Sequence, residues 1–155
     1  MKTTFGVLVI FLLGLAASAA TPPDFSGTWA FIPEKSKNIG MMSEMKMTQT
    51  IEQSSVSLDV TANTTYQGDS QQMKTHYDLT GKPATNDSPM AGPSETVSKW
   101  DGEKLVTTWT SKGAVAGTKT VRTETRTLSP DGRTMTLESV RGPNPLVVMV
   151  FEKKK

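Results

Sequence analysis

Apolar residues recur at every second position through most of this chain, and this pattern constrains the fold more than any other feature. The repeat is carried by four sets: Met45, Met47 and Ile51; Val56, Leu58, Val60 and Ala62; Met73, Tyr77 and Leu79; Leu105 and Trp109. Successive side chains of a β-strand point to opposite faces, so a period of two predicts strands with one apolar face. No stretch of ten or more residues shows the 3.6-residue period of an amphipathic helix. We therefore expect an all-β protein.

Turn sequences separate the apolar segments, among them Gln67-Gly68, Asp101-Gly102 and Pro130-Asp131-Gly132. Asp-Gly between two apolar runs is a strong hairpin signal. The pattern predicts strands at 27–32, 45–53, 56–65, 71–79, 94–100, 104–111, 118–128, 134–140 and 146–152. Because short connections join antiparallel neighbours, we expect an antiparallel up-and-down meander closed into a barrel of about 8–10 strands. The connections 33–44 and 80–93 are longer, and we expect both to be loops at the barrel mouth.

Two residue types that carry much of enzyme and metal chemistry are scarce. The chain has no cysteine, which excludes disulfides, thiolate metal sites and a cysteine nucleophile. Its one histidine, His76, excludes multi-histidine metal sites and is the only possible base for a serine triad. The net charge of +2 is too small for strong attraction to nucleic acid. We therefore expect a non-catalytic protein without a cofactor.

The first twenty residues differ from the rest. Lys2 precedes an unbroken apolar run from Phe5 to Leu15, and Ala17-Ser18-Ala19 fits the small-x-small rule for cleavage. The run is too short to cross the ~30 Å hydrocarbon core of a membrane. This predicts a signal peptide at 1–20, cleaved after Ala19 or Ala20, and a barrel domain at 21–155. The mature protein would have no membrane span and would be secreted or periplasmic.

Three short motifs resemble one known family. Asp24-Phe25-Ser26-Gly27-Thr28-Trp29, just after the apolar run, resembles the opening of calycin barrels, which include lipocalins, avidins and fatty-acid-binding proteins. Lys99-Trp100-Asp101-Gly102 is similar to a hairpin of fatty-acid-binding proteins, and Val150-Phe151-Glu152-Lys153 to the family's C-terminal end. Together the motifs look like small secreted lipocalin-like proteins of soil bacteria. The resemblance implies a lipocalin-like barrel, and it carries no activity with it.

Gly27 and Trp29 are expected to have a structural role. An indole can plug the closed end of a small barrel, and a glycine lets the chain enter close beside it. We therefore assign Trp29 to the core rather than to a ligand contact.

A barrel with long loops and no catalytic set favours binding of a small, largely apolar molecule in its interior. Seven residues are candidate contacts in the interior or at the mouth: Met45, Met47, Leu58, Val60, Met73, Tyr77 and Trp109. The alternative is a barrel filled with its own side chains, acting as a structural or protein-interaction module.

The segment 118–128 has a charged face and a threonine face. Arg122, Glu124 and Arg126 share one parity. If this face is interior, the two arginines could hold a ligand carboxylate, as arginines do in fatty-acid-binding barrels. Because burying charges is costly, we favour a solvent-exposed charged face, and we keep Arg122 and Arg126 as candidate ligand contacts.

The methionines suggest a second alternative. Met45, Met47, Met73 and His76 could bind Cu(I), which prefers soft ligands, or His76 could bind haem iron. His76, however, has the opposite parity to Met73 and Tyr77, so we expect it to face solvent. Packing in the core or in a covering loop is the simpler explanation for the methionines. We therefore assign no metal.

Overall fold

The computed structural model describes residues 21–88 and 92–155, which form one ten-stranded antiparallel sheet. The strands lie in the order β4-β3-β2-β1-β10-β9-β8-β7-β6-β5, so strands that are consecutive in the chain pair with each other, except β4 and β5, and the first strand also pairs with the last. The predicted signal peptide, residues 1–20, lies outside the described residues. The elements are β1 (Gly27–Phe31), η1 (Pro33–Lys35), η2 (Gly40–Glu44), β2 (Lys46–Gln53), β3 (Ser57–Tyr66), β4 (Asp69–Asp78), β5 (Ala84–Ser88), β6 (Gly92–Asp101), β7 (Lys104–Lys112), β8 (Lys119–Leu128), β9 (Thr134–Arg141) and β10 (Val147–Lys153).

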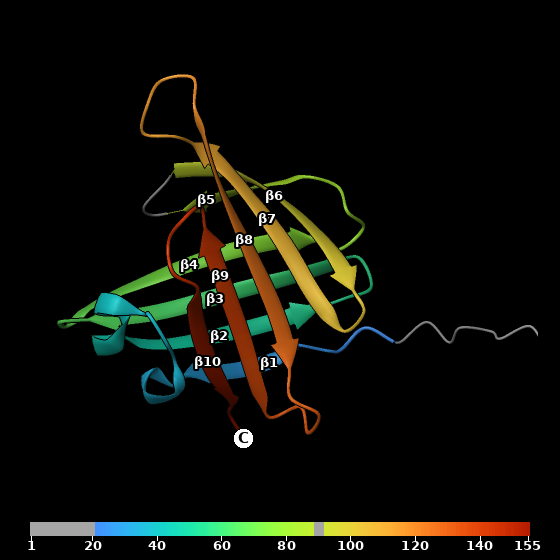
Figure 1. The fold of residues 1–155 in the computed structure, drawn as a ribbon. Helices are drawn as coiled ribbons and strands as arrows, with labels where there is room; N and C mark the ends of the chain where they lie inside the picture. Colours follow the sequence, from blue (N-terminus) through green and yellow to red (C-terminus); the bar gives the residue numbers. More distant parts are fainter. Residues whose placement is uncertain (1–20, 89–91) are drawn as a thin grey trace, which may run out of the picture.

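Pairing of the first strand with the last curls this sheet into a barrel. β1 lies between β2 and β10, with Trp29 opposite Lys153 and Phe31 opposite Phe151. In Figure 1, β2–β4 run across the direction of β7–β10, so the two halves of the sheet face each other. Among the described residues no ladder joins the two edge strands, β4 and β5. The barrel is therefore nearly closed, and the predicted antiparallel meander is confirmed.

One strand was not predicted. β5 lies inside the segment 80–93, which we expected to be loop, and it pairs with β6 from Ala84↔Thr96 to Ser88↔Gly92. Its sequence has no alternating apolar residues, so nothing in its own pattern marks it as a strand. The other long connection, 33–44, contains the short 3-10 helices η1 and η2. No helix in the described part of the chain is long and apolar enough to cross a membrane.

The two long connections lie at opposite ends of the barrel, which corrects the expectation that both lie at one mouth. Connections in an up-and-down barrel alternate between ends, so the β1–β2 and β4–β5 connections must be separated. Lys37 of the first bridges to Val148 at the start of β10. Leu79 of the second bonds to Val56 in the β2–β3 turn. We call the end with Lys37 the mouth and the other the closed end.

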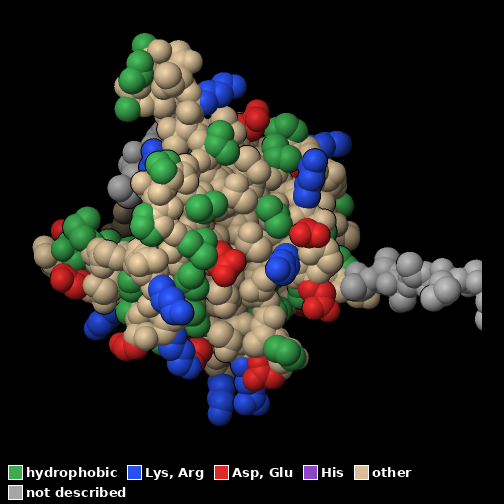
Figure 2. All heavy atoms as spheres, in the orientation of Figure 1, with side chains coloured by type: hydrophobic (Ala, Val, Ile, Leu, Met, Phe, Trp, Pro, Cys, Tyr) green, Lys and Arg blue, Asp and Glu red, His purple; other side chains and the backbone are tan. Residues whose placement is uncertain are grey.

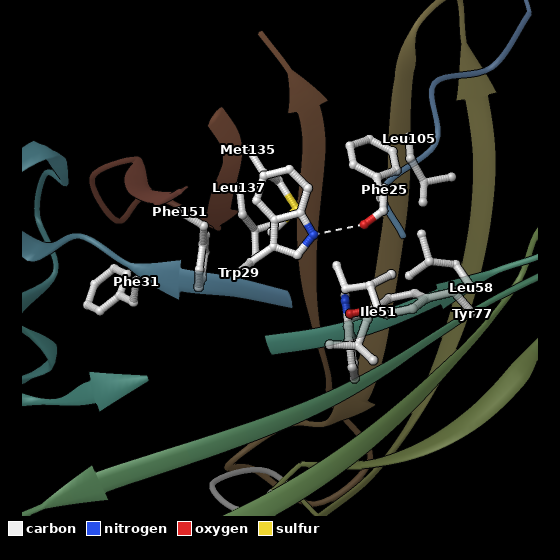
Figure 3. Packing of buried hydrophobic residues seen from close by; sticks show 12 residues of the cluster. Phe25, Trp29, Phe31, Ile51, Leu58, Tyr77, Leu105, Met135, Leu137 and Phe151 are labelled. Carbon is white, nitrogen blue, oxygen red and sulfur yellow. Dashed lines mark hydrogen bonds between the residues drawn. The ribbon is translucent and has the colours of Figure 1, made fainter. Parts of the chain in front are cut away.

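The hydrophobic core lies inside the barrel and extends from Phe25 at the closed end to Phe31 at the mouth end of β1 (Figure 3). Phe25 and Trp29 are completely buried, and the Trp29 indole N–H donates to the Phe25 carbonyl over 2.8 Å. Gly27, two residues earlier, has a φ of +125°, a conformation that L-residues rarely adopt. The remaining core residues are Phe31, Ile51, Leu58, Val60, Tyr77, Leu105, Trp109, Met135, Leu137 and Phe151. Trp29 thus sits where a plug would sit.

Candidate ligand-binding site

The charged face of β8 lies inside the barrel. Only 7% of Glu124 and 4% of Arg126 is exposed, so our preference for a solvent-exposed charged face was wrong. The reason is register: Arg126 lies opposite Leu105, a buried residue of β7, and the side chains of a directly opposed pair share one face. The threonine face of β8 is therefore the outer one.

Glu124 is buried with partners for both of its oxygens. Its Oε2 accepts from the Trp109 indole N–H over 2.9 Å, and its Oε1 lies 3.1 Å from Arg122 Nη2. The Arg122 guanidinium carbon lies 4.5 Å from the centre of the Trp109 ring, which adds a cation–π contact. A buried carboxylate is tolerated when it is paired and hydrogen-bonded, and Glu124 meets that condition because the partly exposed Arg122 and the Trp109 indole supply its partners.

Arg126 is buried without a counter-charge. Its Nη1 donates to Gln49 Oε1 over 3.3 Å and lies 3.2 Å from Met135 Sδ. Its guanidinium carbon lies about 6 Å from the rings of Phe25 and Tyr77, at 6.0 and 5.9 Å. No carboxylate in the described part of the chain lies within salt-bridge distance of Arg126. The interior thus holds two guanidinium groups and one carboxylate.

Two aromatic side chains meet across the barrel interior. The Tyr77 and Trp109 rings meet edge to face, with centroids 6.0 Å apart, and so join β4 to β7 across the interior. Burial, and then the neighbouring Glu124 carboxylate, raise the pKa of the Tyr77 phenol, which keeps it neutral. The contact links the two halves of the sheet through the core.

Side chains become less buried toward the mouth. Arg122 is 35% exposed, and several apolar residues here are only half-buried. We call five of them the mouth cluster: Ile39, Met42, Met47, Met73 and Met149. Four pack against the core, and Met73 lies opposite buried Ala62 on the inner face of β4. Methionine is flexible, so such a cluster can adapt to a guest molecule.

Hydroxyl groups line the inner face of β6, a feature that sequence reasoning missed. Ser94, Thr96 and Ser98 are all buried, and Ser98 hydrogen-bonds to Thr107 of β7 over 2.9 Å. Alternating Ser and Thr carry no hydrophobic signal, so the pattern gave no sign that this face is interior. Gln49 is also buried and polar, and its position gave no such sign either.

The structure brings some of the predicted site residues together. Tyr77, Trp109, Arg122 and Arg126 form one contact group through the interactions above, with Met47 and Met73 on the mouth side. Leu58 and Val60 are buried in β3. Met45 lies just before β2 and is half-buried.

The four residues of the copper alternative do not converge. His76 is exposed on the outer face of β4, where its Nδ1 lies 2.7 Å from Asp59 Oδ1, whereas Met73 is on the inner face. Within the described ranges, no three His, Cys, Asp or Glu side chains are grouped so that they could hold a metal ion.

Two surface hollows lie on the outside of the barrel. The larger, about 420 Å³, lies over β2, β3 and β4 and reaches β5. Its lining residues are Thr50, Glu52, Asp59, Val60, Thr61, Lys74, Thr75, His76 and Asn86. The smaller, about 200 Å³, lies over β6, β7 and β8. The outer surface around β8 and β9 is otherwise mixed, with scattered apolar and charged side chains (Figure 2).

Several solved structures share this fold. The REP1-NXSQ fatty acid transporter matches with a TM-score of 0.65 at 14% identity, covering 84% of this chain and 96% of its own. Human cRBP IV matches with a TM-score of 0.65 at 19% identity, covering 86% and 100%. A variant of the fluorescent protein UnaG matches with a TM-score of 0.63 at 16% identity, covering 84% and 96%. No protein-family model matches the sequence, and no curated protein matches it significantly.

These likenesses define the fold. The chain has the same fold as these proteins, with ten antiparallel strands in one up-and-down sheet that curls into a nearly closed barrel. The fold that the sequence resemblance implied is therefore confirmed.

Proposed function

We propose that this protein is a non-catalytic binding protein for a small, largely apolar molecule that carries an acidic group. The observation that carries the proposal is the unbalanced charge of the interior, where Arg122 and Arg126 face one carboxylate, Glu124. An uncompensated buried charge is costly, and a ligand carboxylate would offset that cost. The apolar part of the ligand would lie in the mouth cluster.

The mouth cluster supplies the second half of the argument. Its methionines are half-buried and flexible, so their side chains can rearrange around a bound chain or ring. The similarity in fold to a fatty acid transporter agrees with this proposal. The acidic group would point inward to the arginines, and the apolar body would replace contacts that the methionines make with each other.

A fluorescence titration tests the mouth. We expect cis-parinarate, a fluorescent fatty acid, to gain fluorescence on binding. Replacing Met47→Gln should raise its Kd about tenfold, because an amide would be buried against the apolar tail. Lys46→Gln, the outward neighbour, is the control and should leave the Kd unchanged. If both variants change the Kd equally, the ligand does not contact the mouth cluster.

A competition experiment tests the acidic group. Hexadecanoate should displace cis-parinarate at a concentration about tenfold lower than hexadecanol does, because only the acid can pair with a guanidinium. Arg126→Met keeps the side-chain volume and removes the charge, so it should abolish this preference. Arg133→Met, at an exposed position, should preserve it. An acid preference that survives in Arg126→Met would remove Arg126 from the site.

The contact of Tyr77 with Trp109 across the barrel favours a second candidate, a structural or interaction module with a filled interior. The same titration decides between the two functions. If cis-parinarate and a panel of retinoids and porphyrins cause neither a fluorescence change nor a thermal shift, the binding proposal fails and the filled barrel remains.

We also propose that the protein is secreted or periplasmic, on the strength of the apolar run and cleavage motif in 1–20. The mass of the protein from its own host should correspond to a chain that starts at Ala20 or Thr21. A mass that includes Met1 to Ala19 would contradict the proposal.

A further inference from the structure

A single side chain joins the two edge strands of the barrel. The Asn86 amide of β5 accepts from the His76 backbone N–H and donates to the His76 carbonyl, both over 2.8 Å. The amide also donates to Thr96 Oγ1 over 2.8 Å, which anchors it to β6. In the described residues, β4 and β5 share no other hydrogen bond. We call the line between these strands the seam.

The segment that covers the mouth is tied to the barrel by more hydrogen bonds than the seam is. Lys37 and Val148 exchange two backbone hydrogen bonds, of 2.8 and 3.0 Å. Asn38 Nδ2 donates to the Leu146 carbonyl over 2.7 Å. Backbone hydrogen bonds thus tie the segment that carries η1 and η2 to β10, and opening the mouth breaks them. Opening the seam breaks only the bonds of one amide.

The larger surface hollow lies directly outside the seam. Asn86 and His76 line it, and so does Lys74, the next outward residue of β4. Lys74 makes no ion pair with any described residue. The hollow also holds the carboxylates of Glu52 and Asp59, of which Asp59 is paired with His76, so a molecule that arrives there meets both signs of charge beside the seam.

From these contacts we propose that the seam is the entrance for the ligand and that Asn86 is its latch. The ligand first enters the hollow and then passes inward as the amide of Asn86 leaves the His76 backbone. The proposal rests on the binding function argued above. It makes the side wall of the barrel, rather than the mouth, the part that moves.

Cross-linking tests the entrance. The chain has no cysteine, so a short bis-maleimide can join one introduced pair without side reactions. The pair Lys74→Cys and Asp87→Cys ties the seam, and the pair Lys37→Cys and Val148→Cys ties the mouth covering. We expect the seam cross-link to slow association of cis-parinarate at least about tenfold and the mouth cross-link to change it less than about twofold. The reverse order would overturn the proposal.

The latch has its own test. Asn86→Leu keeps the volume of the side chain and removes its hydrogen bonds, so association and dissociation of cis-parinarate should both speed up about tenfold with a similar Kd. Asn63→Leu is the control, because the partner of the Asn63 side chain within the described residues is the exposed side chain of Gln72. A change confined to the dissociation rate would make Asn86 a ligand contact rather than a latch.

Hydrogen exchange in the absence of ligand separates failure of the entrance from failure of the binding function. If the seam is the weakest line, the His76 amide should exchange at least about tenfold faster than the amides of Lys37 and Val148. Slower exchange at His76 would overturn the entrance proposal even if cis-parinarate binds. Fast exchange at His76 without any cis-parinarate binding would contradict the binding function alone.

Discussion

At the scale of single residues, Trp29 is the clearest determinant of stability. It is completely buried, its N–H bonds the Phe25 carbonyl, and Lys153 Nζ lies 5.2 Å from its ring centre. Trp29→Ala should lower the free energy of unfolding by about 3–5 kcal/mol, because it leaves a cavity and an unpaired carbonyl. Trp29→Phe keeps most of the apolar contact and should cost less. Urea denaturation measures both, and a loss below about 1 kcal/mol for the alanine variant would contradict the plug role.

Tyr77 gives a prediction about pH. Burial, and then Glu124, raise the pKa of its phenol above the ordinary value of 10.0, so the folded state favours the neutral form. This contribution to stability is complete below pH about 10 and declines as the pH rises further, because the unfolded chain then ionises more readily. Tyr77→Phe should remove part of the alkaline loss of stability, measured as unfolding free energy against pH. Tyr66→Phe, the same substitution at a less buried position, should not.

Residue parity was predictable and the choice of face was not. Met47, Met73 and Tyr77 point inward as the period of two requires, because alternation is a property of each strand alone. Which face of β8 points inward depends instead on its pairing with β7. The charges on that face predicted solvent exposure, because the partners of Glu124, Trp109 and Arg122, are known only from the structure. Asn86 could not be predicted as a latch, since its partner is the backbone of a strand with which it shares no ladder.

At the scale of elements, the apolar run 146–152 was predicted as a strand, and this strand, β10, lies between β1 and β9 and so closes the sheet. It brings Phe151, which is completely buried, into the core. A chain that ends at Leu146 should therefore not fold, because the barrel would lose both the ladder that closes it and part of its core. Circular dichroism and size-exclusion chromatography would detect this. Removal of Lys155 alone is the control, and a folded truncated chain would contradict the role of β10.

β5 shows the opposite case. Five polar or small residues form a strand because β6 offers a paired edge and Asn86 reaches β4, and neither cause is visible in the segment itself. Strand identity there comes from tertiary partners rather than from hydrophobic period. The same lack of a ladder to β4 is what makes this strand the movable part of the wall.

At the scale of the whole molecule, the seam predicts where the chain can be opened. Lys154 bonds to Thr28, so both ends of the described barrel lie at the closed end and a short Gly-Ser linker can join Lys155 to Thr21. A circular permutant opened between Lys82 and Pro83 begins with β5 and ends with β4, and keeps every ladder of the sheet. Its free energy of unfolding should lie within about 2 kcal/mol of the parent. A control permutant opened between Gly102 and Glu103 cuts a hairpin inside the continuous sheet, so its free energy of unfolding should fall further. Equal losses of unfolding free energy in the two permutants would mean that the seam is no weaker than the rest of the barrel wall.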